Sequence, residues 1–143
     1  GEWGHNPLPW MTPEERPGPQ CYCGKLGCIE TFLSGPALER EFERATGRAL
    51  AAREIAGAAE RADAAALGAL AEYEDRLARG LAHITNILDP DVIVIGGGLS
   101  NVTRLYANVP PRMQQFVFST RAGVKIVPAL HGDSSGVRGA AWL

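Results

Sequence analysis

The chain has 143 residues, of which 45% are hydrophobic and 21% are charged, and its formal net charge is −2. This length and composition suit one domain with one ordinary core. The charge balance lacks the basic footprint of a nucleic-acid-binding protein, and no apolar run approaches the roughly 20 residues that span a bilayer. Because the start also lacks a signal-peptide pattern, we expect a cytoplasmic protein that binds neither membrane nor nucleic acid.

The chain opens with GEWGH at Gly1, and its first methionine is Met11. We therefore expect the C-terminal part of a longer protein, or a processed chain. Five prolines within residues 6–20 predict an irregular loop, because proline lacks an N–H donor and fixes φ. A loop of this length usually has a function, and holding a metal ion would account for it.

All three cysteines lie in one short window, CYCGKLGC at residues 21–28. With a histidine on the far side of the loop they form a Cys₃His set, which is typical of a closed, structural zinc site. An odd number of cysteines argues against a disulfide framework, although a Cys23–Cys28 disulfide remains an alternative. The predicted ligands are His5, Cys21, Cys23 and Cys28.

Two carboxylates flank this metal set. Glu2 lies three residues before His5, and Glu30 lies two residues after Cys28, so metal binding would fix where both carboxylates point. Two carboxylates and an imidazole that converge on one cavity could bind the hydroxyls of a sugar. The alternatives are that Glu2 is a solvated terminal residue and that Glu30 caps a helix, where negative charge is favourable.

Apolar spacing predicts a series of helices after the cysteine window. A short helix is expected over 29–33, a second from Pro36 to Gly47, and a third over 51–61. Asp63 would cap a long helix that runs from residue 64 to about residue 88. This helix should stop at Asp89-Pro90, because the residue before proline is disfavoured in the helical region.

The last third of the chain adds strands. The run VIVI at 92–95 predicts a central strand buried on both faces, followed by Gly96–Gly98, a helix to about Gln115 and a second strand over 124–127. The tail predicts a final helix capped by Asp133 or Ser134. This order indicates a layered α/β architecture. A glycine turn before a helix can bind a phosphate through its backbone N–H groups. However, tight turns require glycine in any case, and the sequence GGG does not match a known nucleotide-binding motif.

The motifs GEWGH, CYCGKLGCIE and DPDVIVIGGGLS, in that order, give the chain a resemblance to the ROK family (repressors, open reading frames, kinases). The resemblance covers essentially the whole chain and is closest to the bacterial fructokinases, through GEWGHNPLPW, CYCGKLGCIETF and HGDSSGVRGAAWL. It implies the C-terminal lobe of an actin-like ATPase (ribonuclease H-like) sugar kinase fold with an inserted zinc-binding loop. The implied reaction is phosphorylation of a hexose, fructose in the first place, by Mg-ATP, and we expect a homodimer.

The family pattern also implies roles for single residues. Glu2, His5 and Glu30 would bind the sugar, with His5 also a zinc ligand, and Gly97 and Gly98 would lie along the nucleotide. The single domain, 1–143, would then contain a sugar- and zinc-binding segment at 1–30 and a nucleotide-side α/β segment at 89–143. The family's catalytic aspartate, in an Asn-Asp pair upstream of GExGH, and its DxGxT turn are not in this sequence. We therefore expect no catalysis by this chain alone.

Two other functions use the same residues. The chain would be the effector-sensing domain of a ROK repressor if it binds sugar without phosphoryl transfer. It would be a zinc-stabilised fragment for oligomerisation if the metal only supports the fold. An upstream Asn-Asp pair and DxGxT turn would indicate the kinase, and an upstream helix-turn-helix would indicate the repressor.

Overall fold

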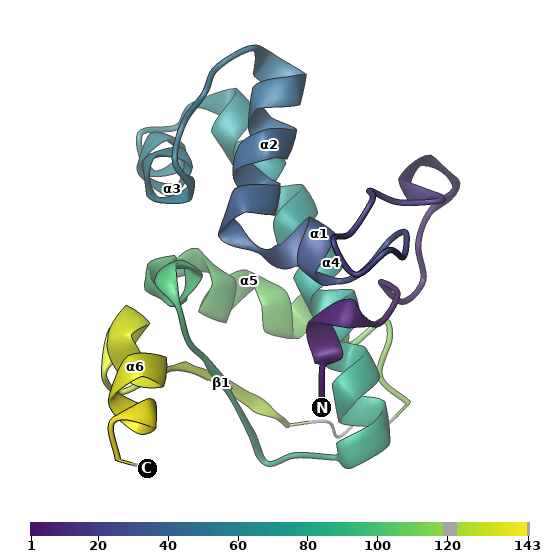
Figure 1. The fold of residues 1–143 in the computed structure, drawn as a ribbon. Coiled ribbons are helices and arrows are strands. Elements are labelled where there is room, and N and C mark those ends of the chain that lie inside the picture. The colour runs from purple at the N-terminus through teal and green to yellow at the C-terminus, as the bar shows by residue number, and fades with distance from the viewer. Residues whose placement is uncertain (119–122, 143) are drawn as a thin grey trace.

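The long helix α4 (Ala64–Leu88) forms the centre of the fold, which the computed structural model describes for residues 1–118 and 123–142 (Figure 1). Four helices pack against it: α1 (Glu30–Leu33), α2 (Gly35–Thr46), α3 (Ala52–Glu60) and α5 (Arg104–Met113). Phe42, Ile55 and Leu70 are among the largest fully buried side chains of the shared core. The helices therefore form one layer around α4.

The helix ends follow the chemistry of their terminal residues. The Asp63 carboxylate accepts a hydrogen bond from the backbone N–H of Ala66 at 2.9 Å, which satisfies one free donor at the start of α4. α2 ends at Gly47, whose φ of 71° is the left-handed conformation that glycine adopts without strain. α4 ends at Leu88 and is followed by its C-cap Asp89, directly before Pro90. The predicted cap at Asp63 and the predicted end of α4 are confirmed.

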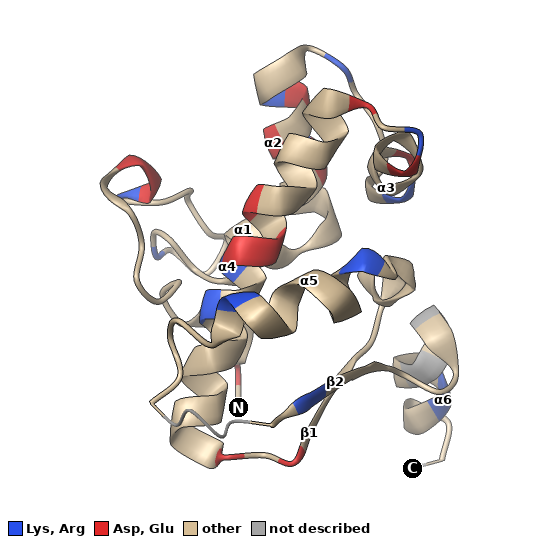
Figure 2. Cartoon of the chain, turned by 180° about the vertical axis from the view of Figure 1, so that it is seen from behind, with Lys and Arg blue, Asp and Glu red and all other residues tan. Residues whose placement is uncertain are grey.

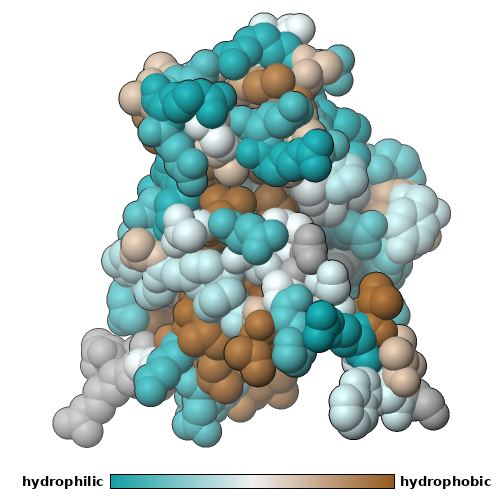
Figure 3. Space-filling view, turned by 90° about the vertical axis from the view of Figure 1, so that its left-hand side faces the viewer, coloured by the Kyte–Doolittle hydropathy of each residue, from teal (hydrophilic) through white to brown (hydrophobic). Residues whose placement is uncertain are grey.

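The sheet has two parallel strands within the described residues. β1 (Val92–Ile95) pairs with β2 (Lys125–Pro128), with Val92 opposite Lys125. The prediction that β1 is buried on both faces is wrong, because Val92 and Val94 are 47% and 58% exposed. Ile93 and Ile95 pack against the helical core, so the helices cover one face of β1 only. Figure 3, which views the left-hand side of Figure 1, shows exposed apolar side chains in the lower part of the molecule.

The segments around the strands differ in detail from the prediction. After β1 the chain forms a short 3-10 helix, η3 (Gly98–Asn101), and only then α5, which contains Pro110 and Pro111. The predicted final helix is present as α6 (Ser135–Ala140), which follows η4 (Gly132–Ser134). Ser134 stands at the N-cap position without a side-chain capping bond, and the side chains of Asp133 and Ser135 lie outside the described set.

An ion-pair cluster fastens the proline-rich loop to α4. Glu15, in η2 (Pro13–Glu15), accepts hydrogen bonds from Arg79 Nη2 at 2.7 Å and from Arg76 Nε at 2.8 Å. The three side chains are only 9%, 3% and 11% exposed. Burial alone would raise the pKa of Glu15, but the bonds from both arginines lower it to about 2. The loop that carries the cysteine window is thus fixed against the central helix.

The surface carries charges of both signs. In Figure 2 acidic and basic residues are spread over most of the elements that the structure describes. A single-sign face is the usual electrostatic footprint of nucleic-acid binding. Within residues 1–118 and 123–142, no helix has the length and apolarity to cross a membrane.

Candidate functional site

Four side chains of the kinds that bind metals meet near the start of the chain. His5, at the end of η1 (Trp3–His5), and the three cysteines place their ligand atoms within 4.8 Å of one another. The Cys23 and Cys28 sulfurs are 3.6 Å apart, and the Cys21 sulfur is 3.5 Å from His5 Nδ1. Tetrahedral zinc, with Zn–S of about 2.3 Å and Zn–N of about 2.1 Å, requires separations of about 3.8 Å and about 3.6 Å. The donor set therefore fits a zinc ion.

The backbone brings these ligands together by folding twice on itself. Pro7 forms an antiparallel bridge with Cys28, which sets the GEWGH segment beside the cysteine window. The proline-rich loop returns at Gly18, which has a φ of 86° and packs against the backbone of Gly27. A Cβ atom on Gly18 would lie 2.4 Å from the Cα atom of Gly27, so only glycine fits this crossing.

The thiols differ in how readily they lose a proton. A backbone hydrogen bond from Lys25 lowers the pKa of Cys23 to about 7, whereas burial raises the pKa of Cys28 to about 12. Zinc binds thiolates, so a zinc ion must displace the proton of Cys28 when it binds at neutral pH. Metal affinity should therefore rise with pH.

The two ring nitrogens of His5 face different groups. Nδ1 faces the cysteine sulfurs, and Nε2 lies 2.8 Å from the hydroxyl of Tyr22 and 3.8 Å from a carboxylate oxygen of Glu30. Metal binding at Nδ1 places the proton on Nε2. His5 can thus hold a metal on one side and donate a hydrogen bond on the other.

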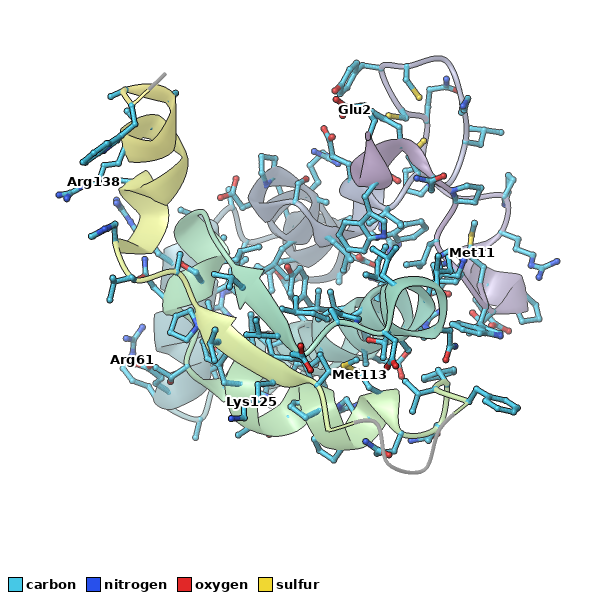
Figure 4. The ribbon with its side chains drawn as sticks, turned by 90° about the horizontal axis from the view of Figure 1, so that it is seen from below. Glu2, Met11, Arg61, Met113, Lys125 and Arg138 are labelled. Atoms are coloured by element: carbon cyan, nitrogen blue, oxygen red, sulfur yellow. The ribbon has the colours of Figure 1, made fainter. Side chains whose placement is uncertain are left out.

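Of the two predicted carboxylates, Glu30 lies beside this imidazole, and Glu2 is exposed in the same part of the chain. Glu30 is the first residue of α1, where its negative charge is favourable, but the N-cap is Ile29 and no side chain makes a capping bond; the Glu30 carboxylate lies close to Gly4. It also lies 3.8 Å from His5 Nε2, so its place in the first turn of α1 leaves it available to bind a ligand. Glu2 is exposed at the start of η1, and Figure 4 shows it beside the sulfur-bearing loop. The structure thus gathers Glu2, His5 and Glu30 in one region.

Two residues of this region were given no place in the site by sequence reasoning, which expected Trp3 only to pack and did not single out Tyr22. Trp3, between Glu2 and His5, packs closely against Gly80 of α4. A Cβ atom on Gly80 would lie 3.1 Å from the ring of Trp3. This contact places η1 on the central helix. Tyr22 was passed over because an aromatic residue between two metal ligands has no distinctive spacing of its own. Gly80, one of two glycines in α4, was a sequence signal for the first contact.

A groove of about 1030 Å³ lies next to this region. Gly96, Gly97 and Gly98 line one part of it, α2 and α3 line another, and Trp3 lines the end towards η1. Gly97 has a φ of 76°, and its carbonyl accepts a hydrogen bond from the Ser100 hydroxyl at 2.7 Å. The predicted nucleotide-side glycines therefore border a groove that reaches the segment carrying the metal site.

Comparisons with known proteins agree with this arrangement. The model of the ROK family matches residues 1–143. An N-acetyl-D-glucosamine kinase of Photobacterium profundum is 40% identical over 147 residues, which cover 100% of this chain and 48% of that protein. The chain thus spans about half the length of the curated relatives it matches.

Solved structures show the same fold. A ROK family glucokinase from Streptomyces griseus, in complex with glucose and AMPPNP, superposes with a TM-score of 0.81 at 24% identity, over 98% of this chain and 49% of that one. A ROK family transcriptional regulator, a homologue of the E. coli MLC protein, superposes with a TM-score of 0.73 at 24% identity, over 90% of this chain and 34% of that one. The fold alone therefore accommodates both a kinase and a regulator.

Proposed function

The chain belongs to the ROK family, and on this basis we propose that it supplies the sugar clamp, a structural zinc site and part of the nucleotide cleft of an ATP-dependent hexose kinase. It would form the C-terminal lobe of that enzyme, with the zinc-binding loop as an insertion. The curated relative described above is an N-acetyl-D-glucosamine kinase and not a fructokinase. We therefore take N-acetyl-D-glucosamine as the first sugar to test, ahead of glucose, mannose and fructose.

The orientation of His5 is the observation that carries this proposal. Its Nδ1 atom faces the cysteines, while its Nε2 atom lies on the side of Glu30. A sugar hydroxyl both accepts and donates hydrogen bonds, so it can accept from Nε2–H and donate to the Glu30 carboxylate. A second hydroxyl can donate to Glu2. Bonds that involve a charged carboxylate are the stronger kind, which suits a site that must hold the acceptor hydroxyl in place.

Zinc would act in this site through geometry. With four protein ligands it has no open coordination position, and when bound it supplies a fixed tetrahedral centre. His5, Cys21, Cys23 and Cys28 would hold it. Because the ring of His5 cannot rotate while Nδ1 is a ligand, Nε2–H stays aimed at the sugar. The zinc ion would therefore help to position the sugar and would take no direct part in phosphoryl transfer.

The nucleotide side of the proposal rests on the groove at Gly96–Gly98. Mg-ATP would be the co-substrate, with Gly97 and Gly98 along the nucleotide, since glycine lets a backbone come close to phosphates. Phosphoryl transfer depends mainly on positioning and on charge stabilisation, so two adjoining binding sites are what the reaction requires. The catalytic aspartate would come from the other half of the kinase. The exposed face of β1 supports this division, because parallel strands are usually covered on both faces.

A second function uses the same clamp. The fold shared with the transcriptional regulator accommodates, as an alternative, a sensing domain that binds sugar without transferring phosphate. The two functions differ in what accompanies the clamp. A helix-turn-helix in the rest of the protein would indicate the regulator, whereas an Asn-Asp pair and a DxGxT turn would indicate the kinase.

Sugar binding by the zinc-loaded chain tests the proposal. Calorimetric titration should show binding of N-acetyl-D-glucosamine or another sugar of the panel. Glu30→Gln should weaken this binding roughly 10- to 100-fold, because hydrogen bonds to a charged group contribute roughly 1.5–3 kcal/mol. Its thermal unfolding should match that of the unmodified chain.

Two further readings complete this experiment. With ATP and magnesium added, the chain alone should release no sugar phosphate, because the expected base is missing. Efficient turnover would contradict that part of the proposal. An absence of binding for every sugar of the panel would overturn the clamp itself. Loss of folding in Glu30→Gln would instead support a purely capping role for this residue.

A further inference from the structure

Tyr22 contacts His5 although its side chain is not held in place by the core. The side chain is 81% exposed, so no core packing holds it. Its hydroxyl nevertheless lies 2.8 Å from His5 Nε2, and its ring meets the imidazole edge-on with centroids 4.9 Å apart. Glu30, at 3.8 Å from the same nitrogen, is beyond hydrogen-bonding distance. Tyr22 is therefore the hydrogen-bond partner of Nε2.

A neutral imidazole has only one N–H group. When Nδ1 faces the metal, that group is Nε2–H, and it makes one good hydrogen bond at a time. The proposed sugar site requires the same N–H for a sugar hydroxyl. A phenol hydroxyl donates one hydrogen bond and accepts others, as a sugar hydroxyl does. The Tyr22 hydroxyl and the sugar therefore cannot occupy this position together.

We propose that Tyr22 sets the sugar affinity of the site by occupying the hydrogen-bonding position of the sugar on His5 until a sugar displaces it. This inference rests on the proposed sugar-binding function. Tyr22 acts as a competing residue, and removal of its hydroxyl should strengthen binding.

The surroundings of Tyr22 confine the displacement to its side chain. Its neighbours Cys21 and Cys23 are both predicted metal ligands, so a bound zinc ion would fix the backbone on either side. The backbone N–H of Cys21 also donates to the carbonyl of Lys25 at 2.9 Å, which closes the turn. Because the ring is exposed, it can rotate about χ1 away from His5 without disturbing the packing of the core. Sugar binding therefore exchanges one hydrogen bond of His5 for another.

Tyr22→Phe tests this competition, since it keeps the ring and removes only the hydroxyl. We expect the variant to bind N-acetyl-D-glucosamine about 3- to 10-fold more tightly than the unmodified chain by calorimetry, as a neutral hydrogen bond of ordinary strength would no longer oppose binding. In the unmodified chain, the NMR signals of the Tyr22 ring should shift when sugar is added. Tyr106→Phe is the control, because it removes a tyrosine hydroxyl bonded to the Ser100 carbonyl, and its sugar affinity should not change.

The possible results separate the two proposals. Tighter binding by Tyr22→Phe at equal zinc content supports the competition. Binding that is equal or weaker overturns it and leaves the sugar site standing. If neither binds any sugar of the panel, the proposed function fails and the competition fails with it.

Discussion

Cys28→Ser should reduce the zinc content of the purified, reduced chain from about one ion to less than about 0.1 ion per chain. Structural zinc contributes roughly 10–16 kcal/mol in small metal-dependent domains, and a serine hydroxyl does not replace a thiolate as a ligand. Cys28 is 1% exposed and forms the backbone bridge with Pro7. Loss of the ion should therefore also loosen the GEWGH segment. Mass spectrometry of the intact chain would measure its zinc content, and hydrogen exchange of the first 30 residues would measure the loosening.

Lys25→Ala provides the matched control for this substitution. Lys25 lies in the same turn, its side chain is exposed, and its backbone makes the contacts described above. The control should keep one zinc ion per chain. Full zinc content in Cys28→Ser, or no zinc in the unmodified reduced chain, would contradict the assigned ligand set.

Glu15→Gln should lower the free energy of unfolding by about 3 kcal/mol and the melting temperature by roughly 10 °C at neutral pH. The substitution leaves Arg76 and Arg79 without their shared buried carboxylate, and breaking such a pair on one side is strongly destabilising. Since folding lowers the pKa of Glu15 from 4.5 to about 2, its stabilisation is present above about pH 4.5 and is lost as the pH falls towards 2.

Urea titrations at several pH values measure this effect. Glu14→Gln, a change in an exposed neighbour, is the control, because any acid-induced release of zinc affects both variants equally. The stability difference between the two variants should be large at pH 6 and should shrink between about pH 4.5 and pH 2. A difference that stays constant across this range would show that the Glu15 charge does not support the fold.

The sequence was most informative where the chemistry is local. The cysteines lie within residues 21–28, and ligand type together with spacing was enough to predict their convergence with His5. The long helix was predictable for a related reason, because Asp63 and Pro90 mark its ends and its apolar stripe is periodic.

Contacts between distant segments could not be predicted in this way. Nothing in the sequence pairs Glu15 with arginines more than 60 positions away, or seats Trp3 on Gly80. Both contacts depend on the path of the proline-rich loop, which has no periodicity. The exposure of β1 has a different cause. An apolar run predicts that both faces of a strand are buried. It does not predict which segment packs on each face.

The affinity for sugar with and without zinc tests the central claim most directly. The claim is that the metal holds His5, and through the adjoining segment Glu2 and Glu30, in position to bind a sugar. N-acetyl-D-glucosamine should bind the zinc-loaded chain, should fail to bind after zinc is removed with a chelator, and should bind again when one equivalent of zinc is restored. Equal affinity in the zinc-loaded and zinc-depleted chain would contradict the claim.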